Sequence, residues 1–166
     1  MSINTYRASS ALTITLASPL ASSSGLTVGR CSTSYSNATN KDEILALAGQ
    51  ITVGTTTTAG VIEVWAFAQR ADSTWPDLFT AAYTGTDGGF TIRSRDILFA
   101  GARLVGGSIT VAASLTNVPF SFGPQDLSAL FGYPPKDLAF FVTHSSGVAL
   151  NGTAGNHAMH ILPAYY

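Results

Sequence analysis

The sequence predicts an all-β protein, a two-sheet antiparallel β-sandwich of the jelly-roll type with one short helix. Three observations predict this class: apolar and polar residues alternate with period two, glycine-rich turns separate these stretches, and only one segment carries helical signals. A chain of 166 residues is about one domain long and can bury a core without disulfides. Its single cysteine excludes the disulfide of antibody-type domains, so we favour the jelly roll over the immunoglobulin fold.

The clearest expected strand spans residues 61–69, where Glu63, Trp65 and Phe67 share one face and apolar residues fill the other. Trp65 and Phe67 are expected in the core. The other expected strands span 12–16, 44–53, 90–93, 97–104, 108–115, 138–144, 147–150 and 157–162. Glycines at 84–89, 106–107 and 145–147 suit the tight turns between them.

The expected helix spans residues 124–132. It has an early proline, an acidic Asp126 in its first turn and a terminating Gly132. The segment is about two turns long, and we expect Leu127, Leu130 and Phe131 to pack across one end of the sandwich.

Composition divides the chain at residue 40. Residues 1–40 are rich in Ser, Thr, Gly and Asn, and we expect an extended N-terminal arm or loop with one strand near Leu12. An N-terminal loop as long as residues 18–40 is uncommon in a compact domain unless it is functional or ordered by a partner. Residues 41–166 form the expected jelly-roll domain. Arg7 and the apolar run after it are also compatible with a weak secretory signal, but alternation with Thr favours a strand.

Charge is scarce. Eight Lys and Arg against nine Asp and Glu give a net charge of −1, and charged residues make up 10% of the chain, where about 25% is usual. This balance excludes a nucleic-acid partner and an anionic membrane surface, and no apolar run approaches the 18 or so residues of a membrane helix. A surface with so few charges is expected to be covered by other subunits, because interface cores are depleted in charge.

Trp75, Phe79 and Tyr83 are the candidate binding residues. They follow loop sequence and form either an exposed aromatic platform for a glycan or protein ligand, or an anchor that holds the loop to the core. The anchor is the favoured interpretation.

Other reactive residues support no catalytic, cofactor or metal site. His157 and His160 are three apart in an expected strand and so face opposite sides, while His144 ends another strand. Cys31 lacks the surroundings of a nucleophile. The carboxylates of a glycosidase would have to come from Glu43, Glu63 and aspartates that fall mostly at turns, namely Asp72, Asp77, Asp87, Asp96, Asp126 and Asp137.

Three arginines are close in sequence. Arg93 and Arg95 share a face of an expected strand, and Arg103 follows. Such a group suits a phosphate or the carboxylates of a partner, but pairing with neighbours such as Asp96 is the more common arrangement. We expect no enzyme.

The C-terminal third of the chain carries motifs of a known family, and the expected strand at 62–66 is compatible with them. These motifs are residues 118–122, the helix ending at Gly132, the run 134–142 and the turn 145–150. In them the chain resembles small virion proteins of tailed bacteriophages, of the jelly-roll head decoration or cement type. The similarity covers about residues 44–166 and has no counterpart for residues 1–40. It implies a virion location, most simply the capsid surface after assembly in the host cytoplasm. It implies no catalytic residue and no cofactor.

The expected function is therefore a non-enzymatic capsid decoration or cement subunit. Its partners would be the major capsid protein or other virion subunits, together with copies of itself, for which a trimer is plausible. The alternative is a tail or fibre module that binds a receptor glycan through the segment 75–83. A third hypothesis is a glycan- or peptide-cleaving enzyme that uses Glu63 with an aspartate.

Overall fold

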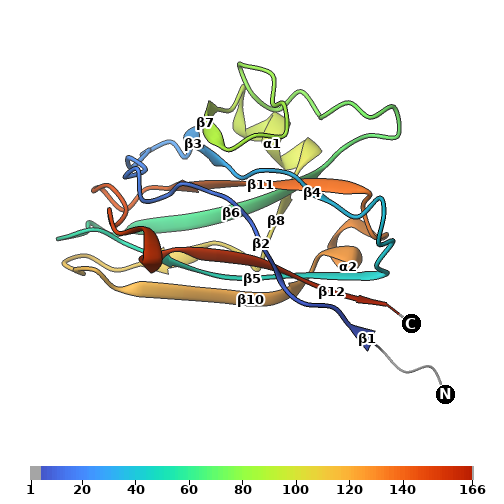
Figure 1. Ribbon diagram of the computed structural model, residues 1–166. Helices are drawn as coiled ribbons and strands as arrows, with labels where there is room; N and C mark the ends of the chain where they lie inside the picture. The colour runs from blue at the N-terminus through green and yellow to red at the C-terminus, as the bar shows by residue number, and fades with distance from the viewer. Residues whose placement is uncertain (1–4, 166) are drawn as a thin grey trace.

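The computed structural model describes residues 5–165 and shows two antiparallel sheets stacked face to face (Figure 1). The first sheet contains β1 (Thr5–Tyr6), β2 (Ser10–Ala11), β5 (Ile44–Thr52), β10 (Pro119–Asp126) and β12 (Ala158–Tyr165). The second sheet contains β3 (Val28–Cys31), β4 (Tyr35–Ser36), β6 (Gly60–Ala68), β7 (Gly88–Thr91), β8 (Arg103–Leu104), β9 (Ile109–Val111) and β11 (Asp137–His144). The helices are α1 (Arg95–Gly101), α2 (Leu127–Phe131) and the 3-10 turn η1 (Ala154–Asn156).

The strand order is that of a jelly roll. The first sheet runs from β1 and β2 through β12 and β5 to β10, and the second from β3 and β4 through β11 and β6 to β8 and β9. The short strands β1 and β2 both pair with β12, β3 and β4 both pair with β11, and β8 and β9 both pair with β6, so each pair occupies one strand position. Counted by these positions, the chain changes sheet at each step except the connection from β6 to β8. Strand β7 is added to the outer side of β3 within that connection. The predicted all-β jelly-roll sandwich is confirmed.

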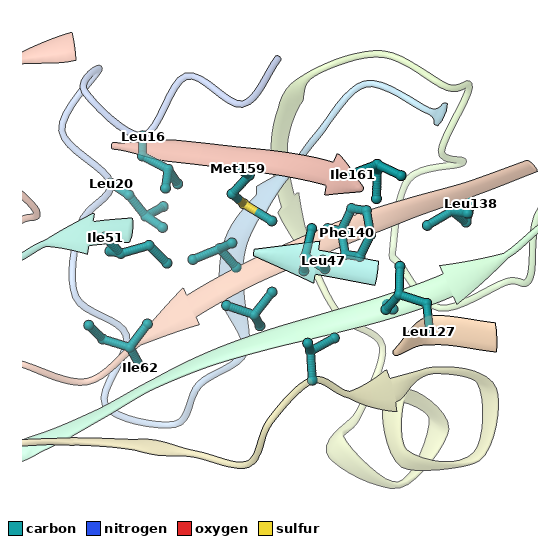
Figure 2. Packing of buried hydrophobic residues seen from close by; sticks show 14 of the residues in the cluster. Leu16, Leu20, Leu47, Ile51, Ile62, Leu127, Leu138, Phe140, Met159 and Ile161 are labelled. Atoms are coloured by element: carbon teal, nitrogen blue, oxygen red, sulfur yellow. The ribbon is translucent and has the colours of Figure 1, made fainter. Parts of the chain in front are cut away.

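Two long antiparallel pairs carry the sandwich. β12 pairs with β5 from Ala158↔Gln50 to Ala164↔Ile44, and β11 pairs with β6 from Leu138↔Ala68 to His144↔Ile62. The side chains that both sheets point inward form one core, drawn in Figure 2. Its fully buried members include Leu16, Leu47, Ile51, Ile62, Leu127, Leu138, Phe140 and Ile161.

The strands predicted at 44–53, 61–69, 138–144 and 157–162 are present as β5, β6, β11 and β12. Those at 90–93 and 108–115 are present in shifted or shortened form as β7 and β9. The strand predicted at 147–150 is absent, and only Leu150 forms an isolated bridge, to Val53. Residues 12–16 are not a strand either: β2 ends at Ala11, although Leu16 beyond it is fully buried.

The strand predicted at 97–104 is wrong. Residues Arg95–Gly101 are helix α1, and only Arg103–Leu104 form a strand. The side chain of Ser94 caps the helix by accepting a hydrogen bond from the backbone N–H of Ile97, and Asp96 lies in the first turn. This capping signal outweighs an apolar run whose periodicity is ambiguous over so short a stretch.

The helix predicted at 124–132 begins later. β10 continues to Asp126, whose side chain caps α2 at the N–H of Ala129, and Gly132 ends the helix in the left-handed conformation as expected. Strand β10 tolerates prolines because it is the edge of its sheet. A register shift lies at Gly123, where any Cβ atom would come within 2.2 Å of the Leu47 carbonyl oxygen.

Residues 5–40 are part of the sandwich and do not form a separate arm. They supply β1, β2, β3 and β4, and Leu16 and Leu20 enter the core between the sheets. Asp87 also holds this segment, since it accepts hydrogen bonds from Thr15 and forms an ion pair with Arg30 at 2.7 Å. The boundary predicted at residue 40 therefore separates compositions and not structural units. Residues 1–4 of the predicted arm lie outside the described residues.

His144 ties the N-terminal segment to β11. Its Nε2 donates to the carbonyl of Leu20 at 3.0 Å, and Ser146 Oγ lies 2.9 Å from its Nδ1. The imidazole is fully buried, and burial lowers its pKa, although the hydrogen bond to Leu20 opposes this shift. The folded protein therefore holds His144 neutral at a pH where the unfolded chain already binds a proton.

We expect the free energy of unfolding to fall as the pH drops below about 6.5, the ordinary pKa of histidine, by at most about 1.4 kcal/mol per pH unit. The stability is fully present above that pH because neither state is then protonated. Urea unfolding of wild type and His144→Gln between pH 7.5 and 5 measures the effect, and the variant should lose this part of the slope. His160→Gln, on the outer face of β12, is the matched control and should keep it. Equal slopes for wild type and His144→Gln would contradict the assignment.

Candidate functional site

The connection between β6 and β8, residues 69–102, lies on the face of the second sheet that points away from the first. We call this segment the cover. In Figure 1 its elements β7 and α1 lie outside β3 and β11, on the side opposite β5, β10 and β12. A second hydrophobic cluster fills the space beneath it. The sheet contributes Cys31, Trp65, Phe67, Ala139 and Phe141, and the cover contributes Leu78, Phe79, Tyr83, Ile92, Leu98 and Ala102.

Phe67 is the centre of the aromatic contacts under the cover. Its ring lies edge-on to those of Trp75, Phe79 and Tyr83, with centroid distances of 5.6, 5.5 and 5.1 Å. Each such pair is worth about 0.5–1.5 kcal/mol beyond the area it buries. The Tyr83 hydroxyl also donates to the carbonyl of Ser32 at 2.6 Å, and burial raises its pKa. These rings hold residues 74–83 firmly against the sheet.

The structure thus brings the three predicted binding residues together, but not as an open platform. Phe79 and Tyr83 are buried, with exposed fractions of 1% and 6%, so their faces are already covered by protein. Only Trp75 keeps part of its surface free, beside a hollow of about 230 Å³ lined by Thr74 to Phe79 and Ala81 to Tyr83. A ligand that stacks on an aromatic ring would have to use Trp75 alone.

An ion pair between the buried Glu63 and the partly exposed Arg95 holds α1 to the sheet. Arg95 donates through Nη1 to Glu63 Oε2 at 2.7 Å and through Nη2 to Oε1 at 3.0 Å. Trp65 Nε1 donates to the same carboxylate at 2.9 Å, and the Arg95 guanidinium lies over the rings of Trp65 and Phe99. Glu63 is 5% exposed, so its charge depends on these donors for its stabilisation. Glu63 therefore acts as the anchor of the cover.

The three arginines close in sequence do not form one anion site. Arg93 pairs with Asp77 at 3.0 Å, Arg95 pairs with Glu63, and Arg103 donates to the carbonyl of Ala102. The expected pairing of these arginines with Asp96 does not occur within the described part of the chain, where Asp96 forms no ion pair. Because α1 replaces the predicted strand, the shared face on which the grouping depended does not exist.

The remaining predicted candidates take structural positions. His157 accepts from the backbone N–H of Thr52 through Nδ1 and donates through Nε2 to the carbonyl of Asn151. Cys31 is fully buried, and burial raises the pKa of its thiol. Across residues 5–165, no three His, Cys, Asp or Glu side chains are grouped as metal ligands. Within the same range no helix is long and apolar enough to cross a membrane.

Helix α1 of the cover exposes two large apolar side chains, among exposed charged residues of the same segment such as Asp77, Arg93 and Asp96. Ile97 and Phe99 on α1 are 39% and 56% exposed, and Val28, on the adjoining strand β3, is 44% exposed. Sequence reasoning missed this surface because it placed Ile97 and Phe99 in a strand. The capping residue Ser94 was the signal that would have placed them on a helix.

Comparison with known protein families, with curated proteins and with solved structures finds no match to this chain.

Loss of the buried ion pair should be costly. We expect Glu63→Gln to lower the free energy of unfolding by about 2–4 kcal/mol, because it leaves the guanidinium of Arg95 unpaired beside the core. Arg93→Gln breaks an exposed pair of the same chemistry and should cost less than about 1 kcal/mol. Urea denaturation of the two variants measures the difference. Equal losses would show that Glu63 does not anchor the cover.

Trp75→Ala tests whether Trp75 is an anchor. We expect a loss of about 1–3 kcal/mol, a fall in Tm of several degrees, because a half-buried aromatic ring is removed from the cluster. Tyr133→Ala, at an exposed aromatic residue, should change stability by less than about 0.5 kcal/mol. Calorimetry of both variants checks this. An unchanged Tm in Trp75→Ala together with lost sugar binding on a glycan array would favour the ligand platform.

Proposed function

We propose that this protein is a non-enzymatic structural subunit of a tailed-bacteriophage virion that decorates or cements the capsid. The observation that carries the proposal is a surface with very few free charges and with exposed apolar side chains on the rigid cover. Jelly rolls serve as capsid and as lectin domains, so the fold is compatible with this role.

Most of the charge in this chain is used internally. Five ion pairs engage ten of the 17 charged side chains, and two of these pairs involve the buried carboxylates of Asp42 and Glu63. The other seven charged side chains, together with exposed members of these pairs such as Arg93, Asp77 and Lys136, are distributed over an accessible surface of 7746 Å². Free subunits normally distribute many charges over such a surface, whereas surfaces that meet partners are depleted of them. This pattern supports a protein that works in contact with neighbours.

The proposed adhesion uses the faces of the sandwich. The accessible surface of the chain is close to the roughly 7,800 Å² of a compact monomer of 17.2 kDa. Residues 5–40 supply strands and core side chains to the sandwich, so we assign the adhesion to its faces and not to an extended arm formed by this segment. A specific contact buries about 800 Å² on each partner, which one face of this sandwich can supply.

The reactive side chains also support a structural role. Glu63 holds Arg95 and Trp65, His144 holds Leu20 in the core, and Cys31 packs under the cover. Each is at most 5% exposed, so each contributes to the fold from a position that a substrate would not reach.

A second candidate function is a receptor-binding module of a tail or fibre. The hollow beside Trp75, of about 230 Å³, favours it, because sugars stack on tryptophan and this volume suits a single ring. The burial of Phe79 and Tyr83 limits the contact to one aromatic ring, so we place this function second.

Co-sedimentation of the purified protein with shells assembled from the major capsid protein of the same virus tests the proposal. We expect saturable binding at a fixed ratio to the shell subunits, because a decoration subunit occupies a defined place on the shell. Phe99→Ser on the cover should weaken binding about tenfold or more, the usual effect of losing an aromatic anchor.

Ala113→Ser, at an exposed loop residue away from the cover, is the matched control and should bind like wild type. A protein that stays in the supernatant at micromolar shell concentrations would overturn the capsid role. A glycan affinity abolished by Trp75→Ala without loss of stability would favour the receptor-binding module.

A further inference from the structure

A groove lies between the cover and the end of the sandwich. Two adjoining hollows of about 280 and 350 Å³ share Arg70, Pro76, Ala100 and Gly101, so they form one continuous depression. One hollow extends to Arg103 and Tyr133, and the other extends along α1 to Ile97. We call this feature the arginine groove.

Its walls are largely apolar. Tyr133 is 54% exposed and Ile97 is 39% exposed, and Pro76 and Ala100 lie on the floor between them. Aromatic rings and arginines are the residues most enriched at the energetic centres of protein interfaces. A groove that combines them is suited to bind a polypeptide segment.

The two arginines of the groove have no carboxylate partner within the protein, as far as the described residues extend. Arg70 donates to the carbonyl of Trp75 at 3.4 Å, and Arg103 donates to the carbonyl of Ala102 at 3.1 Å. Asp72, the carboxylate nearest to Arg70 in sequence, accepts hydrogen bonds from Thr74, which lower its pKa, and the charge of Arg70 adds to this shift without a hydrogen bond between the two side chains. Both guanidinium groups therefore keep their full charge and most of their donors available.

The one carboxylate in the groove does not neutralise them. Asp77 borders the hollow along α1, and it is engaged by Arg93 at 3.0 Å. The other ion pairs of the protein lie outside the residues that line the groove. The groove is thus a local positive site on a chain whose net charge is −1.

We propose that the arginine groove docks a segment of a partner protein that carries apolar side chains flanked by carboxylates. This inference rests on the proposed function, since the partner would be a neighbouring virion subunit. Apolar side chains of the segment would lie on Ala100, Ile97 and Tyr133. Its carboxylates would accept paired hydrogen bonds from the planar guanidinium groups of Arg70 and Arg103.

The groove is held in shape before any partner binds. Gly101 lies so close to the buried Leu78 that a Cβ atom there would come within 2.6 Å of the leucine Cδ2. Leu98 fixes α1 from below, and the pair between Arg95 and Glu63 fixes its first turn. A preformed site of this kind loses little conformational entropy on binding.

Fluorescence polarisation with two labelled octapeptides, DELFDELF and KKLFKKLF, tests the inference on the full chain. We expect the acidic peptide to bind at least tenfold more tightly than the basic one, and its binding to weaken as salt is raised. Arg103→Glu should abolish this preference. Lys136→Glu, which reverses an exposed cation outside the groove, is the matched control and should keep it.

Ala100→Trp provides a second test that leaves the charges unchanged. The indole would fill the groove, so we expect binding of the acidic peptide to fall at least tenfold, while urea unfolding confirms that α1 is intact. Equal affinities for the two peptides, or equal effects of Arg103→Glu and Lys136→Glu, would overturn the inference.

The same variants separate this inference from the capsid role. If Arg103→Glu binds shells as tightly as wild type, the groove is not the contact and the inference falls, while the capsid role stands. If the protein does not bind shells but binds the acidic peptide preferentially, and this preference is lost in Arg103→Glu, the inference about the groove stands and the capsid role falls.

Discussion

Burial of both faces of β6 and β11 is the constraint on which the rest of the structure depends. Their inner face packs against the first sheet, and their outer face packs under the cover. Phe140 and Phe141 are adjacent in sequence, yet both are fully buried, in different clusters. A strand covered on both sides has no solvated face. Residues 69–102 must therefore remain in place to keep the outer faces of β6 and β11 from contact with water.

This constraint explains the positions of several charged residues. Glu63 is the only charged residue of β6, and its outward position would leave it buried without a partner. Arg95 supplies the partner from α1, and Asp87 draws the segment near Thr15 and β3 together through Arg30. Asp42, Glu63 and Asp87 thus use their charges to hold the fold together, whereas Arg70 and Arg103 in the groove have no carboxylate ion-pair partner among the described residues.

Features that depend on the local residue pattern could be predicted from the sequence, and features that depend on contacts between distant segments could not. β5, β6, β11 and β12 were predictable because each is a long run whose alternation or continuous apolarity is local information. Helix α1 was not, since Ile97 to Ala100 suit either a helix or a strand, and only the capping geometry of Ser94 decides. Of the candidate site, the identities of Trp75, Phe79 and Tyr83 were predictable, but their burial was not. The groove was not predictable because Arg70, Ala100 and Tyr133 come from separate segments.

The amino-acid order alone therefore determined that this protein is a β-sandwich with a sparsely charged surface, because period-two patterning and composition act residue by residue. The tertiary structure decided which aromatic rings are hidden, which arginines are paired and where the groove beside α1 lies. Each of those properties depends on the cover folding over β6 and β11, a contact between residues far apart along the chain.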